Sequence, residues 1–262
     1  MRLSTLTLTS LLLAAGAAVA SDDLTIVTKH TLNGKPSGTT TSYMSSDHVR
    51  MARDEGNESI IDLKTGVMTV LDGKKKTYYT VTKQDMEQLA AKMKERMDTP
   101  EMKQAMEAMA SMSGGMSTSF DVKKMGTSRK VAGYGCEDWT ITMGTMSTIK
   151  ECVTTELQYP VQAWQTYREF SESMKNMASA FGPMVKSGAE LAEKLKAMKG
   201  FPVATSTLVD VMGHKSSTES EVIEVRKGSI PASAWEIPAG YAKIENPMLK
   251  AFDGHGRGRP NH

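Results

Sequence analysis

The sequence predicts an α+β fold in which blocks of amphipathic helix are inserted between runs of antiparallel strands. Short apolar segments bounded by turn residues recur at spacings of roughly eight to twelve residues, which is typical of a β-meander. Two other stretches repeat methionine and leucine at helical spacing. The blocks follow the order strands, helices, strands, helices, strands, and this order favours antiparallel α+β packing over a parallel βαβ fold.

The first block of strands lies between residues 24 and 81. Each predicted strand ends at turn residues such as Asn33-Gly34 or Asp72-Gly73, and Asp-Gly between apolar segments is a strong hairpin pattern. The predicted strands span residues 24–32, 48–53, 59–63, 67–71 and 77–81.

The first block of helices follows directly. Thr82, with Asp85 three residues later, resembles a helix N-cap with an acidic first turn, and Met86 and Met93 share the apolar stripe of the helix that ends near Met97. Thr99-Pro100 is a typical start for a second helix, since proline fits the first helical position. Met106 and Met109 belong to its stripe, and Gly114-Gly115 ends it.

The second half of the chain repeats this alternation. Strands are predicted over about 118–156, a helix over about 161–180 that includes Trp164, and a further helix that ends before Gly200-Phe201-Pro202. Two more strands are predicted over about 203–212 and 218–226.

The first 20 residues predict export. Arg2 precedes a short apolar run, and Ala18-Val19-Ala20 forms a cleavage site of the Ala-x-Ala type before Ser21. The run is too short to span a bilayer permanently, so we expect a periplasmic protein with no integral membrane segment after cleavage. We expect residues 21–248 to form a single domain and residues 249–262 a flexible Gly-rich tail.

The only two cysteines, Cys136 and Cys152, are predicted to form a disulfide, since an exported chain meets an oxidising compartment. If residues 137–142 and 147–153 form a hairpin that turns at Met143-Gly144-Thr145, the two sulfurs lie directly opposite each other. The alternative is a reactive thiol at Cys136, although its surroundings lack the second glycine of a nucleophile elbow.

Three stretches resemble an uncharacterised family of exported bacterial proteins, the domain of unknown function 4412, which is grouped with the LolA/LolB-like half-barrels. The first comprises Asp47-His48-Val49-Arg50-Met51, with residues 60–66 and Thr77-Tyr78-Tyr79 after it. The second is Gly133-Tyr134-Gly135-Cys136-Glu137-Asp138-Trp139, and the third runs from Ile230 to Tyr241. The resemblance implies a curved antiparallel sheet, a LolA-like half-barrel, whose concave face is covered by the inserted helices and shelters an apolar hollow.

The resemblance also implies hydrophobic cargo, a lipid or a lipoprotein acyl chain. The 21 methionines permit three interpretations. They could fill an irregular hydrophobic core, line an adaptable apolar cavity, or bind Cu(I) through their thioethers. The expected ligand-binding residues are side chains on the helices and at the mouth of the hollow: Met86, Met93, Met106, Met109, Trp139 and Trp164.

Several classes of function receive no support. The net charge of +2 is too small to indicate nucleic-acid binding. No G-x-S-x-G or Walker sequence occurs, and the five histidines lack the spacing of zinc ligands. We therefore expect a non-enzymatic protein without a cofactor or a metal. The alternatives to a hydrophobic ligand are an envelope interaction module without cargo, which would have a protein partner, and copper binding through the methionines.

Overall fold

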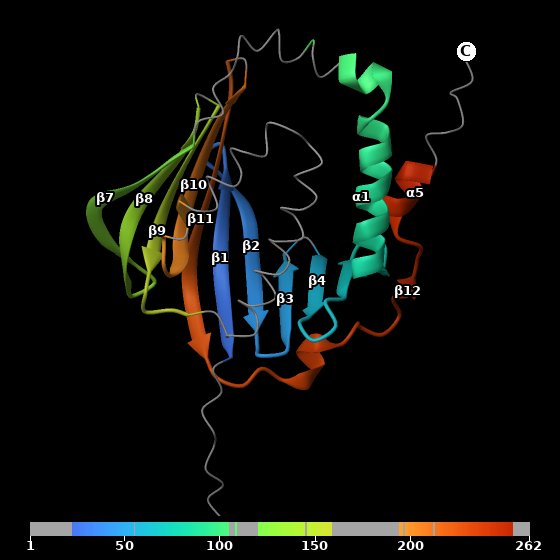
Figure 1. The fold of residues 1–262 in the computed structure, drawn as a ribbon. Helices are drawn as coiled ribbons and strands as arrows, with labels where there is room; N and C mark the ends of the chain where they lie inside the picture. Colours follow the sequence, from blue (N-terminus) through green and yellow to red (C-terminus); the bar gives the residue numbers. More distant parts are fainter. Residues whose placement is uncertain are drawn as a thin grey trace, which may run out of the picture.

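A computed structural model describes residues 23–54, 56–104, 108, 120–144, 146–158, 194–195, 197–211 and 213–253. Its main feature is one large, curved and unclosed sheet (Figure 1). The strands are β1 (Leu24–Leu32), β2 (Lys35–Met44), β3 (His48–Arg53), β4 (Asn57–Asp62), β5 (Met68–Asp72), β6 (Thr77–Val81), β7 (Phe120–Val131), β8 (Tyr134–Met143), β9 (Ser147–Thr154), β10 (Phe201–Val211), β11 (His214–Lys227) and β12 (Ala242–Lys243).

The strand order across the sheet is β12-β6-β5-β4-β3-β2-β1-β11-β10-β9-β8-β7. Two meanders therefore meet where β1 pairs with β11, with Leu24 opposite Lys227. All neighbouring strands are antiparallel except β12, which pairs in parallel with β6. The predicted antiparallel sheet is confirmed.

Within the described residues the helices include α1 (Lys83–Met97), the 3₁₀ turn η1 (Ala232–Trp235) and α5 (Pro247–Asp253). The predicted cap of α1 is confirmed, because the backbone N–H of Asp85 donates to Thr82 Oγ1 and the Thr82 N–H donates to Asp85 Oδ2, at 3.1 and 2.7 Å. The α1 helix packs against α5 beside the β12 edge (Figure 1). Helix geometry resumes at residues 100–104, after Thr99.

Most of the other predicted helices, including residues 161–180, lie outside the described residues. Covering of the concave face by inserted helices therefore stays a prediction. No helix in the described ranges is both long enough and apolar enough to cross a membrane.

The main hydrophobic core is formed by residues of both meanders, around the paired strands β1 and β11. Leu24 and Ile26 of β1 pack with Val203 of β10 and Val222 of β11, all nearly inaccessible to solvent. This cluster also contains both cysteines and Met44, Val131, Leu157, Phe201 and Ala204. The core therefore joins the halves of the sheet at their shared seam.

The predicted disulfide is confirmed, but its predicted register is wrong. Cys136 and Cys152 are bonded, with their Cα atoms 5.3 Å apart. However, β9 pairs Cys152 with Asp138, so Cys136 lies two residues along β8 from the directly opposed position. The bridge joins diagonal neighbours on one face of the hairpin, which the strand twist brings within disulfide range.

A C-terminal segment, residues 230–244, runs along β3 and β6 and is called the clasp below. The Trp235 ring stacks on the His48 ring, with centroids 5.2 Å apart and planes at 19°. Arg50 Nη1 donates to the carbonyl of Ala234 at 2.6 Å, and β12 extends the sheet beyond β6. The first and third motifs of the family resemblance therefore meet in space.

Candidate functional site

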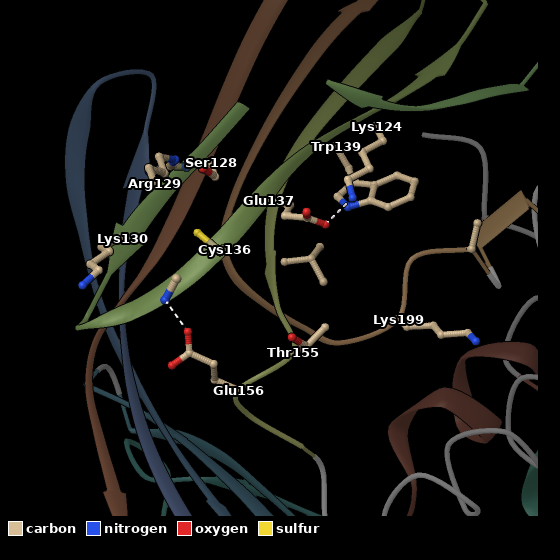
Figure 2. A pocket seen from close by; sticks show the side chains of 13 residues that line it. Lys124, Ser128, Arg129, Lys130, Cys136, Glu137, Trp139, Thr155, Glu156 and Lys199 are labelled. Atoms are coloured by element: carbon tan, nitrogen blue, oxygen red, sulfur yellow. Dashed lines mark hydrogen bonds and ion pairs between the residues drawn. The ribbon is translucent and has the colours of Figure 1, made fainter. Parts of the chain in front are cut away.

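A pocket of about 670 Å³ lies at the β7 end of the sheet (Figure 2). It is formed by β7, β8 and β9, by the residues that follow β9, and by the segment that leads into β10. Its lining comprises Lys124, Ser128, Arg129, Lys130, Gly135, Cys136, Glu137, Trp139, Val153, Thr155, Glu156, Ala197 and Lys199. Most of these side chains are polar or charged, so the pocket is more polar than the expected apolar hollow.

The second motif of the family resemblance forms the turn and the first half of β8 at this pocket. Ala132 and Gly133 both have positive φ, of 49° and 86°, which makes the tight turn from β7 into β8. The backbone N–H of Gly135 donates to Glu156 Oε1 at 2.9 Å. A Cβ atom at Gly135 would lie 3.0 Å from that oxygen, so glycine permits the carboxylate to approach.

The ion pairs leave the pocket with cations in excess. Lys124 pairs with Glu137 at 2.6 Å, and Arg129 pairs with Asp138 at 3.3 Å. Lys130 and Lys199 also line the pocket, and neither pairs with a carboxylate in the part of the chain that the structure describes. With Glu156 as the remaining carboxylate of the lining, the described residues give the pocket a small excess of positive charge.

Trp139 belongs to a row of side chains that crosses the sheet on one face. Residues that lie directly opposite each other on neighbouring strands share a face. From β7 to β1 the row contains Lys124, Trp139, Glu151, Thr205, Ser220 and His30, and a 2.8 Å hydrogen bond between His30 Nε2 and Thr40 Oγ1 extends it to β2. The adjacent row on this face is apolar near the pocket, with Val122 opposite Ile141 and Ile141 opposite Ile149.

Two titratable groups of the polar row have shifted pKa values. Burial raises the pKa of Glu151 above its ordinary value, because the charged carboxylate loses solvation. Burial and, secondarily, the charge of Arg53 lower the pKa of His30. Both shifts favour the neutral forms of these side chains.

Of the predicted ligand-binding residues, Trp139 lies in the pocket. Met86 and Met93 lie on α1, which packs against α5, and they do not line this pocket. Met106, Met109 and Trp164 lie outside the described residues, so a ligand site or a copper site that uses them stays a prediction. Within the described ranges, no group of three or more His, Cys, Asp or Glu side chains is arranged to hold a metal ion.

Sequence reasoning missed Lys199, Lys124 and Glu151. Side chains alternate between the two faces along β7 and β9. With the strand register known, this alternation places Lys124 and Glu151 on the same face as Trp139. Lys199 falls at the end of a predicted helix, and nothing in its local sequence marks it as a binding residue. The reactive-thiol alternative is wrong, since both cysteines are in the disulfide.

Residues 25–241 match a family described as a domain of unknown function, DUF4412. The chain belongs to the DUF4412 family. The match extends from β1 to the clasp and so includes the pocket and all three motifs. No curated protein matches the sequence significantly.

Solved structures with a similar chain path are distant from this DUF4412 protein. An uncharacterised conserved protein from Thermus thermophilus is 6% identical, with a TM-score of 0.42, and the match covers 86% of this chain and 91% of that one. MucB is 12% identical, with a TM-score of 0.39, over 85% of this chain and 59% of that one. PNGF-II is 11% identical, with a TM-score of 0.40, over 88% of this chain and only 32% of that one.

Proposed function

We propose that this protein is an exported, non-enzymatic binding protein of the bacterial envelope that holds a hydrophobic ligand, a lipid or an acyl chain, against the β7–β9 end of its sheet. The observation that carries the proposal is the pocket of about 670 Å³ with the indole of Trp139 among its lining. This volume lies in the range of small-molecule sites in proteins.

The surroundings of Trp139 favour an apolar guest. Trp139 is half-buried, so part of its ring is accessible. Val153 and Ala197 also line the pocket, and the row formed by Val122, Ile141 and Ile149 continues on the face of Trp139. An alkyl chain laid along these side chains would bury apolar surface at about 25 cal/mol per Å².

Two observations support export. The N-terminal pattern is that of a cleaved secretory signal, and the Cys136–Cys152 bridge is of the kind that persists in oxidising compartments. The periplasm satisfies both conditions.

The test is uptake of dodecanoate by the full mature chain, measured by native mass spectrometry and by displacement of a fluorescent fatty-acid probe. Trp139→Ala is expected to weaken binding about tenfold, because the ligand loses contact with the indole. Ile223→Ala is the matched control, since Ile223 is an exposed apolar residue of β11 that does not line the pocket. Absence of uptake by the unsubstituted protein, or equal losses in both variants, would contradict the proposal.

The second candidate is an interaction module without cargo, and the polar character of the pocket lining favours it. In that case, envelope extracts passed over the immobilised protein yield a protein partner that is retained equally well after delipidation. Retention that depends on lipid would favour the binding protein instead.

A further inference from the structure

The charges around the pocket indicate which head group a hydrophobic ligand would carry. Of the four cations that line the pocket, Lys124 pairs with Glu137 and Arg129 pairs with Asp138, which leaves Lys130 and Lys199 against the carboxylate of Glu156. Glu156 accepts the Gly135 N–H. An anionic guest would therefore meet a small excess of positive charge in the pocket lining.

Lys199 is the cation best placed to meet such a guest. Figure 2 shows Lys199 on the segment that leads into β10, with its ammonium at the outer edge of the pocket, whereas Lys130 lies at the opposite end of the pocket near Glu156. A head group near Lys130 would also approach the Glu156 carboxylate. A head group near Lys199 lies on the far side of the pocket from Glu156, and the indole of Trp139 lines the same pocket.

The backbone at Lys199 is held close to β9 by the next residue. Gly200 has a φ of 136°, and a Cβ atom there would overlap the backbone oxygen of Thr154 and lie 2.9 Å from Val153 Cγ1. The segment can approach β9 this closely only because Gly200 has no side chain. The backbone of Lys199 is thereby held beside β9 at the edge of the pocket, and its exposed ammonium pairs with no carboxylate among the described residues.

We propose that the ligand is an anionic amphiphile, with a carboxylate or phosphate head held by Lys199 and an alkyl chain that lies against Trp139. This inference rests on the proposed function, and it assigns the head group and its anchor. A carboxylate and a phosphate monoester share the chemistry that a lysine ammonium recognises, a compact anion with several acceptor oxygens.

The experiment compares four guests of equal chain length on the full mature chain: dodecanoate, dodecyl phosphate, dodecanol and dodecylamine. Binding is measured by displacement of one neutral fluorescent probe at low salt. The two anions are expected to bind about fivefold more tightly than dodecanol, and dodecylamine more weakly than dodecanol. Added NaCl should reduce the preference for anions, because the lysine is exposed and its field is screened.

Lys199→Gln is expected to remove the preference for anions, so that dodecanoate and dodecyl phosphate bind no more tightly than dodecanol. Lys35→Gln is the matched control, since Lys35 is an exposed lysine of β2 remote from the pocket lining. Acetate and inorganic phosphate are added as competitors to distinguish an amphiphile from a free anion, and neither should displace the probe.

Each other outcome overturns a defined part of the inference. Equal binding of dodecanol and dodecanoate removes the anionic head group but leaves the hydrophobic-ligand proposal intact. A preference for anions that survives Lys199→Gln removes Lys199 as the anchor, and displacement by acetate or phosphate alone shows a site for free anions. If none of the four guests binds, the proposed function itself fails.

Discussion

The ring of His48 stacks on the ring of Trp235, with centroids 5.2 Å apart, and this contact joins β3 to the clasp. Next to it, Arg50 donates to Ala234 of the same clasp through its guanidinium. The two side chains extend from β3 to the only long connection that returns from β11 to the β6 edge in the described part of the chain. The clasp is thus fixed by side chains as well as by the β12–β6 pairing.

Replacing Trp235 is expected to loosen the clasp first. Trp235→Ala should destabilise the protein by about 2 kcal/mol, because the stack and the apolar burial of the indole are both lost. Trp235→Phe should lose less, since a ring remains above His48. Urea unfolding measures the loss, and limited proteolysis should place new cleavage within residues 230–244. Unchanged protease resistance of Trp235→Ala would contradict this role.

The ion pair of Arg50 with Glu58 should matter more than any exposed pair. Their side chains are only 13% and 19% exposed, so removing Glu58 leaves a poorly solvated guanidinium. Glu58→Gln should cost about 2 kcal/mol of unfolding free energy. Lys64→Gln, which breaks the exposed Lys64–Asp47 pair, is the control and should cost less than about 1 kcal/mol. Similar losses in both variants would contradict the difference in burial.

Loss of the Cys136–Cys152 bridge is expected to destabilise the fold by about 3 kcal/mol, the chain-entropy value for a loop of this size. The double variant Cys136→Ala and Cys152→Ala should unfold at lower urea concentration than the oxidised protein. Reduction of the unsubstituted protein with dithiothreitol should give a similar shift. If reduction leaves the unfolding midpoint unchanged, the bridge contributes no stability.

Gly200→Ala is expected to cost more than an ordinary substitution at positive φ. The new Cβ would overlap the Thr154 backbone oxygen as well as strain the backbone, for a total of about 3 kcal/mol. Gly213→Ala separates the two effects, because Gly213 also has positive φ, of 83°, but a Cβ added there would have no atom within 4 Å. Equal losses at both positions would mean that β9 and the segment before β10 move apart without cost.

The raised pKa of Glu151 gives a pH dependence of definite sign. The folded state binds the Glu151 proton more tightly than the unfolded state, so this group lowers the stability as pH rises from the unfolded pKa through the folded pKa. Glu151→Gln should therefore stabilise the protein at pH 7, and the gain should disappear at about pH 4, below the ordinary glutamate pKa. Urea unfolding at both pH values measures it, and a gain independent of pH would contradict the assignment.

Local sequence predicted those strands whose apolar residues are bounded by clear turns. The bounds of β1, β3 and β6 agree with the prediction, as does the capped start of α1. The β2 strand was missed, because its threonine- and serine-rich sequence lacks an apolar alternation. Its strand form depends on pairing with β1 on one side and β3 on the other.

The site was predictable only in part, for the same physical reason. Trp139 could be chosen from its residue type, but its neighbours are set by the register of β7, β8 and β9. Local residue preferences contain no information on that register. The contact of His48 with Trp235 was equally inaccessible, although both residues belong to recognised motifs, because it depends on the path of the whole chain.

The pairing of β1 with β11 constrains the order of events during biogenesis. Leu24 emerges near the start of synthesis, whereas Lys227, its partner, emerges only after most of the polypeptide has been made. Until then, one side of β1 has no neighbour, and an open strand edge recruits other extended chains. A molecule built in this way gains from protection by a chaperone, or from delayed folding, until its last long strand is available.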